Sequence, residues 1–252
     1  MAIGRAEPER RADLNPRDRF LAAVSGGALA FAPILWERLP ALVHQERADW
    51  WQDPAVGQRL IADAAALAHA DAMFVFVAAE AIKCAVSAGE VDNDALDSLV
   101  QRAEIENGVE LIRCLHDVAT HGVIAVVPAP SELQVAFDGA EIEAAEDAFS
   151  DLASAFLGAG ADALAVTARQ TDDVAAGVRR AAETGRLFGR PVLGFCEADG
   201  VASGWTADGS SLGVVSPEGV WPAVTAGVVI TAGDVSGRWD APFLRDVGGA
   251  RP

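Results

Sequence analysis

The sequence GVIAVVP occupies residues 122–128, and after an amphipathic stretch at residues 141–157 comes ADALAVT at residues 161–167. Both short runs are apolar almost throughout, rather than alternating between apolar and polar residues. Strands that are covered on both faces have this pattern, and parallel sheets bury both faces beneath their crossover helices. This segment therefore predicts a β-α-β unit with two parallel strands.

The same alternation of apolar runs and amphipathic stretches continues through most of the chain. Further strands are expected at residues 31–37, 71–77, 191–196, 212–216 and 227–231, and further helices at residues 16–24, 40–69, 79–87, 93–120, 171–188 and 217–225. Asn15, Asp53 and Ser216 each precede a proline, and a capping side chain before proline is favourable at the start of a helix. Regular alternation of strand and helix predicts a parallel sheet with right-handed crossovers.

Seven expected strands in 252 residues predict an α/β protein of the (β/α)8 TIM-barrel type, with one βα unit absent or reduced to a loop. Residues 197–211 read EADGVASGWTADGSS and show no helical pattern, so the reduction is expected there. An open doubly wound sheet is the structural alternative. A single barrel domain would span residues 14–247, with flexible segments at residues 1–13 and 248–252.

Composition excludes several classes of partner. The chain carries 37 acidic and 19 basic residues, a formal net charge of −18. Such a surface repels phosphate backbones and anionic lipid, so we expect no nucleic-acid and no membrane partner, and a small-molecule substrate instead. The three cysteines lack CxxC spacing, and residues 1–13 lack the apolar stretch of a signal peptide. These two features predict that this acidic protein is cytoplasmic and keeps its thiols reduced.

Three groups of residues resemble one known superfamily. Residues 16–27 read PRDRFLAAVSGG and lead into APILW at residues 32–36, residues 71–76 read DAMFVF, and residues 158–163 read GAGADA. This pattern resembles uroporphyrinogen decarboxylase and its corrinoid-linked methyltransferase relatives. The resemblance covers residues 16–234 and implies a barrel. Its motifs are mostly structural, so it says more about fold than about chemistry.

The departures from these relatives concern their chemistry. The decarboxylases have an arginine-rich turn after the first strand, whereas residues 36–40 contain only Arg38. The decarboxylases also have an aspartate two residues after the position of Phe76, where this chain has Ala78. The methyltransferases bind zinc through an H-x-C motif, of which residues 194–196 keep only Cys196. The resemblance therefore implies that neither catalytic machinery is intact.

In a barrel the active site lies at the carboxyl ends of the strands, where the βα loops converge. This rule selects the residues that follow each expected strand: Trp36, Glu37, Arg38, Glu80, residues 128–131, Arg169, Cys196, Glu197, Asp199 and Asp234. Arginine forks bind carboxylates in a bidentate manner, and a carboxylate in the mouth can act as general acid or base. The alternative is that these charges are solvated loop residues and that Cys196 is a small buried residue.

The leading functional prediction is a lyase of the decarboxylase type that acts on a small carboxylated substrate without a metal or other cofactor. Arg38 and Arg169 would bind the carboxylate, and Glu80 or Asp234 would move the proton. Trp36, Glu37, Glu197 and Asp199 would line the same substrate site. One alternative is a zinc- or corrinoid-linked methyl or alkyl transferase, with Cys196 as zinc ligand and a corrinoid protein as partner. The other is a non-catalytic binding or assembly subunit, with a homo-oligomer or other partner contacting Trp50 or Trp51.

Overall fold

A computed structural model describes residues 14–42, 49–118, 120–198, 201–206, 213–215 and 227–231, and for residues 38, 197–198, 201–206, 213–215 and 231 only the backbone. The strands are β1 (Leu29–Ala32), β2 (Ala72–Val75), β3 (Gly122–Pro128), β4 (Ala163–Ala168), β5 (Val192–Ala198), β6 (Val201–Thr206), β7 (Gly213–Val215) and β8 (Gly227–Thr231). The helices are α1 (Pro16–Val24), α2 (Leu39–Leu42), α3 (Pro54–Leu67), α4 (Val77–Ser87), α5 (Asn93–Asp97), α6 (Ala103–Val118), α7 (Pro130–Ala136), α8 (Ile142–Gly158) and α9 (Thr171–Phe188). Short 3₁₀ turns are η2 (Trp36–Arg38), η3 (Trp50–Gln52) and η4 (Leu99–Gln101).

Two sheets contain the described strands. One has the order β2-β3-β4-β5-β6, and the other has the order β1-β8-β7. Pairing is parallel throughout except between β5 and β6, which are antiparallel. The expected α/β fold with parallel sheets is thus confirmed. Strands β2 to β5 are neighbours in the order of the chain, unlike the doubly wound alternative, in which the strand order reverses.

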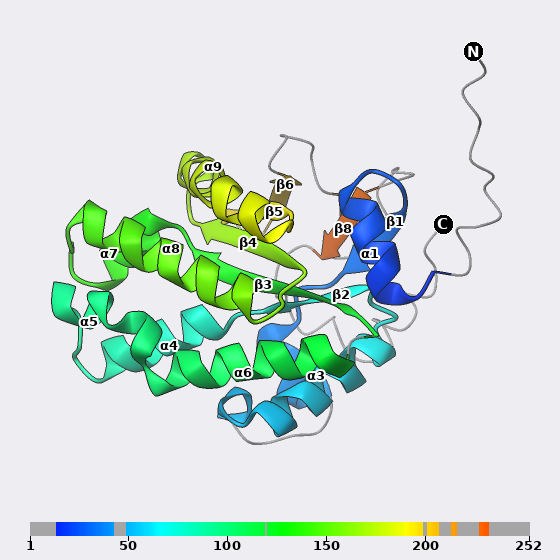
Figure 1. The fold of residues 1–252 in the computed structure, drawn as a ribbon, viewed down its shortest axis with the longest axis horizontal. Helices are drawn as coiled ribbons and strands as arrows, with labels where there is room; N and C mark the ends of the chain where they lie inside the picture. The colour runs from blue at the N-terminus through cyan, green and yellow to red at the C-terminus, as the bar shows by residue number, and fades with distance from the viewer. Residues whose placement is uncertain are drawn as a thin grey trace, which may run out of the picture.

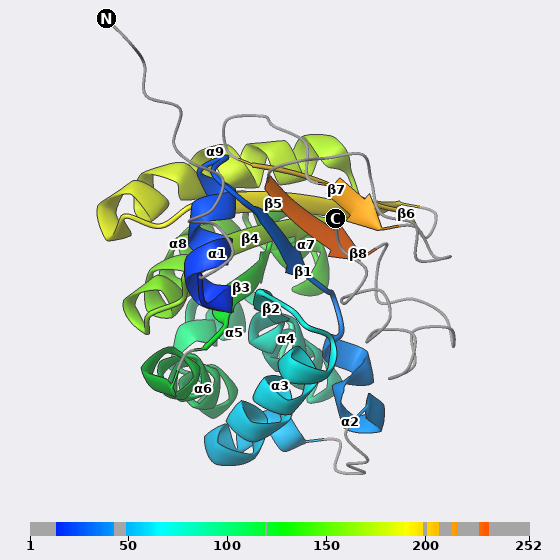
Figure 2. The same ribbon diagram turned by 90° about the vertical axis from the view of Figure 1, so that its right-hand side faces the viewer.

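Helices cover one side of the larger sheet. Helices α3, α4, α6, α8 and α9 pack against β2 to β5, while β1, β8 and α1 lie on the other side of these strands (Figures 1 and 2). Helix α1 contacts β1, β2, β3 and β8, so it packs across strands of both sheets. None of the helices in the described part of the chain is both long and apolar enough to cross a membrane.

Strands β1 to β5 and β8 bury both faces over their described side chains, as the continuous apolar runs predict. Alternate residues of β1 to β5 and β8 form an inner cluster together with Phe20 and Ala23 of α1: Ala30, Ala32, Ala72, Phe74, Ile124, Val126, Ala163, Ala165, Leu193, Phe195, Val228 and Ile230. The intervening residues, such as Met73, Val123 and Val166, pack against the helices in a larger outer cluster. Residues from both sheets therefore share one interior, which is kept narrow by its many alanines.

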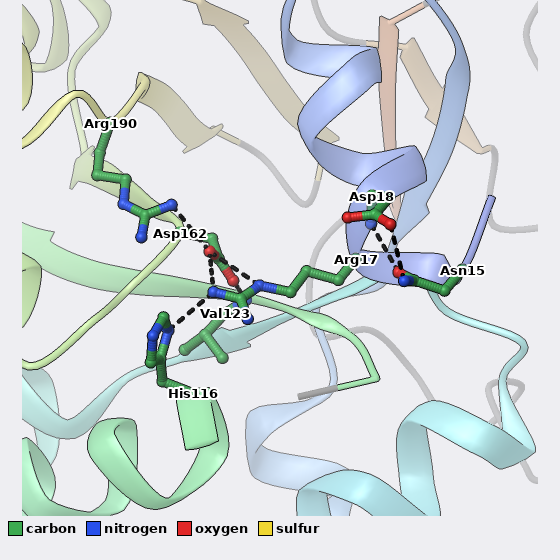
Figure 3. Close-up of polar contacts among 7 residues, drawn as sticks. All are labelled: Asn15, Arg17, Asp18, His116, Val123, Asp162 and Arg190. Carbon is green, nitrogen blue, oxygen red and sulfur yellow. Dashed lines mark hydrogen bonds and ion pairs between the residues drawn. The ribbon is translucent and has the colours of Figure 1, made fainter. Parts of the chain in front are cut away.

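Helix α1 is held to the amino ends of the strands by a buried aspartate, Asp162 (Figure 3). Its Oδ1 accepts hydrogen bonds from Arg17 Nε at 3.1 Å, Arg17 Nη2 at 2.7 Å and Arg190 Nη1 at 3.1 Å. Its Oδ2 accepts from the backbone N–H of Val123 at 3.2 Å. Arg17 Nη2 also lies 2.8 Å from His116 Nδ1. A guanidinium only donates, so this imidazole nitrogen must be the acceptor.

Asp71 makes the same arrangement at the junction between the two sheets. Its Oδ1 lies 2.7 Å from Arg19 Nη1, and its Oδ2 accepts from the N–H of Phe31 in β1 at 2.9 Å. The N–H of Asp71 donates to the carbonyl of Phe31 at 2.7 Å. A buried carboxylate needs such donors, because burying an unpaired charge is costly. The segments 71–76 and 158–163, which carry the family resemblance, thus contain Asp71 and Asp162. Both aspartates accept hydrogen bonds from α1 and from a neighbouring strand.

Several expectations about secondary structure were wrong. The strand expected at residues 31–37 ends at Ala32, and residues 36–38 form the 3₁₀ turn η2. Residues 201–206, expected to be loop, form β6, which pairs with β5 in a hairpin and lies beside β7. Part of the stretch at residues 197–211, where a reduced βα unit was expected, is therefore a strand that runs antiparallel to β5. Residues 130–136, for which no helix was expected, form α7, which begins with Pro130 at its first turn. The expected helix at residues 217–225 and the ends at residues 1–13 and 248–252 lie outside the described residues.

Candidate functional site

A pocket of about 290 Å³ opens at the carboxyl ends of β1, β2, β4 and β5. Its lining comprises Ile34, Trp36, Glu37, Phe76, Ala79, Glu80, Lys83, Thr167 and Phe195. Helix α4 begins at Val77, directly after β2, and this short connection aims its first two turns over the strand ends. The pocket therefore lies where α/β proteins with parallel strands place their active sites. We call it the mouth pocket.

Three predicted site residues meet in the mouth pocket although they come from distant parts of the sequence. Trp36 and Glu37 follow β1 in the turn η2, and Glu80 lies in the first turn of α4. The structure brings a tryptophan and two carboxylates to one cavity, as the rule about strand ends predicts. It also adds Lys83 and Phe195, which that rule did not select.

Aromatic rings form the apolar side of the mouth pocket. The ring centroid of Phe76 lies 6.3 Å from that of Trp36 and 6.1 Å from that of Phe195. Phe74, one layer deeper in the interior, meets Phe195 edge to face at 5.5 Å. Trp50 packs on Trp36 at 4.6 Å, and both indoles are buried. These contacts fix the orientation of Trp36, so it offers a preformed surface to a ligand.

Charged groups of both signs stand beside these rings. Lys83 Nζ lies 3.0 Å from Glu80 Oε1 and 3.8 Å from Glu37 Oε1. The side chain of Glu80 is 21% exposed, against 60% for Lys83 and 69% for Glu37. Partial burial acts to lower the pKa of Lys83, but the hydrogen bond and charge of Glu80, together with the charge of Glu37, outweigh it and raise the pKa. Lys83 is therefore a cation, suited to binding an anion rather than to nucleophilic attack.

Lys83 could have been found from the sequence. It is the only lysine among 252 residues, in a chain that otherwise uses arginine for all its basic side chains. Residues three apart on a helix are neighbours, so a helix after the second strand places Lys83 next to Glu80. The rule about strand ends selects Glu80 but not Lys83, which lies three residues further along α4.

Arg169 follows β4 but does not line the mouth pocket. Its side chain is 80% exposed, and Nε lies 3.5 Å from Glu132 Oε2 of α7. Its backbone N–H donates to Glu132 Oε1 at 2.8 Å. At the end of β4 it is Thr167 that lines the pocket. The arrangement makes Arg169 a partner of α7 and leaves Lys83 as the cation of the described lining.

Cys196 lies on the helix side of β5. Its thiol is buried in the outer cluster and donates to the carbonyl of Arg169 at 3.3 Å, whereas its neighbour Phe195 lines the mouth pocket. Within the described ranges, no three His, Cys, Asp or Glu side chains gather as metal ligands. A zinc site usually requires three or four such ligands, and the described side chains around Cys196 do not make up such a set.

Residues 128–131 are described and form the end of β3 and the start of α7, without lining the mouth pocket. The other predicted site residues fall wholly or partly outside the described residues. Asp199 and Asp234 are not described, and neither are the side chains of Arg38 and Glu197. The backbone of Glu197 pairs with Ala202 in the β5–β6 hairpin. Trp50 and Trp51 are both described, and both are buried at 3% and 4% exposure. The sequence predicts that one of them packs inward while the other meets a loop or a partner subunit. The turn η3 places both indoles in the core, so neither is exposed to a partner.

Together these features define the class of protein: an α/β fold with parallel sheets and a small polar-aromatic pocket at the strand ends. No protein-family model matches the chain, and no curated protein matches it significantly. Among solved structures, a methyltransferase from Methanosarcina mazei is similar, with a TM-score of 0.53 and 14% sequence identity over 71% of this chain and 69% of that chain. At this identity the similarity concerns the fold.

Proposed function

We propose that this chain is an enzyme of the methyl- or alkyl-transfer kind that binds a small carboxylated substrate in the mouth pocket. The observation that carries the proposal is the convergence of Trp36, Glu80 and Lys83 on one cavity at the strand ends. The similarity in fold to a methyltransferase favours group transfer as the reaction class. A corrinoid protein is the partner that this function would require if the methyl group arrives on a second protein.

Lys83 takes the role predicted from the sequence for Arg38 and Arg169, that of counter-ion to the substrate carboxylate. An ammonium within 4 Å of two carboxylates can exchange one of them for a carboxylate of the substrate without losing its partner. Glu80, once released from Lys83, becomes available to accept or return a proton. Trp36 and Phe76 hold the body of the substrate. Arg38, Glu197, Asp199 and Asp234 stay candidates for the remaining sides of the site.

Decarboxylation is the second candidate, and we rank it below group transfer. Val77 and Ala78, which follow Phe76, open helix α4 as buried apolar residues and offer no carboxylate to a substrate. The zinc-dependent form of the transferase is not part of the proposal, because Cys196 faces the helices. The third candidate is a non-catalytic subunit that contacts its partner through Trp50 or Trp51. Both side chains are buried, so they do not support this candidate.

The proposal includes the closure of the two sheets into one (β/α)8-type ring in which β6 is reversed. The shared interior supports closure, since inward residues of β1 and β8 pack with those of β2 to β5. The hydrogen bonds between Asp71 and Phe31 join β1 to the start of β2, and β6 lies beside β7. A closed ring would gather all βα loops at the mouth pocket.

The test is an assay of methyl transfer with isotopically labelled methyl donors, carried out on the purified chain with a panel of small organic acids. We expect Lys83→Met and Glu80→Gln to lower turnover at least tenfold. Arg113→Met and Glu110→Gln change an ion pair with the same three-residue spacing on α6, outside the pocket, and should not affect turnover. Release of carbon dioxide without label transfer would establish decarboxylation instead. Equal activity of all four variants would remove the mouth pocket from the reaction.

A further inference from the structure

The mouth pocket offers a ligand two opposite charges and an apolar surface at the same time. Among the described lining side chains, Lys83 carries the positive charge, and Glu80 and Glu37 carry the negative ones. Ala79 also lines the pocket, and its side chain is small. The aromatic rings of Trp36, Phe76 and Phe195 line the same pocket as the three charged side chains. The charged groups and the rings line one cavity, so one small molecule can contact both.

A ligand with a single charge cannot satisfy this arrangement. A simple carboxylate that pairs with Lys83 faces Glu80 as a like charge, and it displaces that carboxylate from its hydrogen bond of 3.0 Å. A simple amine that pairs with Glu80 faces Lys83 as a like charge. A zwitterion pairs its carboxylate with Lys83 and its ammonium with Glu80. All four charged groups then keep an opposite partner, which matters most for Glu80, the more buried one.

We infer that the substrate of this pocket is a small α-amino acid with an apolar side chain. The inference rests on the proposed function, and it narrows the carboxylated substrate of that proposal to a zwitterion. The α-carboxylate binds Lys83, the α-ammonium binds Glu80, and the side chain packs on Trp36 and Phe76. A volume of about 290 Å³ lies just below the usual range for ligand pockets, about 300–1,000 Å³, and suits a small molecule of this size.

The experiment compares ligands that differ by one charged group. Binding to the purified chain is measured by calorimetry for L-phenylalanine, 3-phenylpropanoate and 2-phenylethylamine, and for L-leucine, 4-methylpentanoate and 3-methylbutylamine. Each charge-assisted pair should contribute about tenfold in affinity. We expect each amino acid to bind at least tenfold more tightly than its acid and its amine.

The variants assign the two charges. Lys83→Met should abolish the advantage of the amino acid over the amine, because the carboxylate loses its partner. Glu80→Gln should abolish the advantage over the acid, because the ammonium loses its partner. Lys83→Arg should keep the preference. Arg113→Met and Glu110→Gln, at the equivalent pair on α6, should leave all affinities unchanged.

Failure of the inference can be told from failure of the proposed function. If the acids bind as tightly as the amino acids and depend on Lys83, the zwitterion is wrong, while the carboxylated substrate stands. If the amines bind most tightly, both the zwitterion and the carboxylated substrate are wrong. If no member of the panel binds saturably, or if binding ignores Lys83 and Glu80, the mouth pocket is not the substrate site.

Discussion

Asp162 illustrates how one buried side chain can hold several elements together. It is fully buried and receives three hydrogen bonds from Arg17 and Arg190, plus one from the backbone N–H of Val123. Removing one partner of a buried ion pair leaves the others unsatisfied and commonly costs 3–5 kcal/mol. The two arginines keep some contact with solvent, at 21% and 25% exposure, so we expect the lower end of that range.

We therefore predict that Asp162→Ala lowers the free energy of unfolding by about 3 kcal/mol. Urea denaturation, followed by far-ultraviolet circular dichroism, measures the change. Glu110→Ala is the control, because it breaks an exposed pair with Arg113 and should cost less than about 1 kcal/mol. Equal effects of the two substitutions would mean that Asp162 does not fasten α1 to the strands.

His121 gives the stability of the protein a predictable dependence on pH. Burial lowers the pKa of His121 below its ordinary value of 6.5, and the charge of Asp71 only partly opposes this effect. Well above pH 6.5 the imidazole is neutral in both the folded and the unfolded chain. As the pH falls below 6.5, the unfolded chain takes up the proton first, so stability is lost until the lower pKa of the folded state is reached.

We predict that the free energy of unfolding falls more steeply between pH 7 and pH 5 in the unmodified chain than in His121→Gln. Urea denaturation at half-unit steps of pH provides the two curves, and a nuclear magnetic resonance titration of the His121 ring reports the pKa directly. Parallel curves, or a pKa of His121 above 6.5, would contradict this prediction.

Some residues of the candidate site could be predicted from the sequence, and others could not. Trp36, Glu37 and Glu80 could be predicted because they lie four or five residues beyond the ends of β1 and β2, and the apolar runs reveal roughly where those strands lie. Arg169 satisfies the same rule, but its carboxylate partner Glu132 lies on α7, a helix that was not expected. The side on which Cys196 lies depends on the register of β5, and shifting that register by one residue would exchange Cys196 and Phe195.

Among the elements, helices α4 and α6 approach each other unusually closely at Gly108. A Cβ atom on Gly108 would lie 1.9 Å from Val77 Cγ1 and 2.8 Å from Val77 Cβ. Val77 is fully buried at the start of α4, so it has little room to move. Overpacking of this kind typically costs 1–3 kcal/mol. Because α4 carries Glu80 and Lys83, this contact also sets their position in the mouth pocket.

We predict that Gly108→Ala destabilises the protein by about 2 kcal/mol and that adding Val77→Ala restores part of the loss. Thermal and urea unfolding measure both variants. Gly158→Ala is the matched control, since its Cβ would meet Phe188 at an ordinary 3.8 Å, and its effect should stay within about 1 kcal/mol. A stable Gly108→Ala variant would mean that α4 and α6 are not in such close contact.

Most elements could be predicted because the pattern of apolar residues in their sequence shows which of their faces are buried. Residues 122–128 and 171–188 form β3 and α9 with the expected bounds, and Asn15 and Asp53 cap α1 and α3 as expected. Strand β6 was missed because its sequence, VASGWT, lacks a continuous apolar run. Its pairing with β5 relies on backbone hydrogen bonds, which any residue except proline can make. The sequence of β6 therefore has neither the apolar run nor the periodicity from which the other strands could be predicted.

At the scale of the whole molecule, the decisive question is whether the two sheets behave as one unit. Phe20 of α1 is fully buried in the inner cluster with residues of β1, β8 and β2 to β5. It also lies so close to the start of β3 that a Cβ on Gly122 would meet its Cδ1 at 2.6 Å. A side chain in this place contributes to the stability of both sheets, whatever the hydrogen bonds between them.

We predict that Phe20→Ala lowers the free energy of unfolding by about 3–5 kcal/mol and that the loss is shared by all strands. Amide hydrogen exchange measures the loss strand by strand. Protection in Val228–Ile230 of β8 and Leu164–Val166 of β4 should fall by the same factor.

Phe137→Ala, the same change in the outer cluster beside α7, is the control for loss of a buried ring. In a closed ring it also lowers protection in β8, because the whole structure opens together. If β8 instead keeps its protection in Phe137→Ala while β4 loses it, the sheets unfold independently. The proposed ring would then be wrong, and the loops after β1 and β2 would no longer be held at a common mouth.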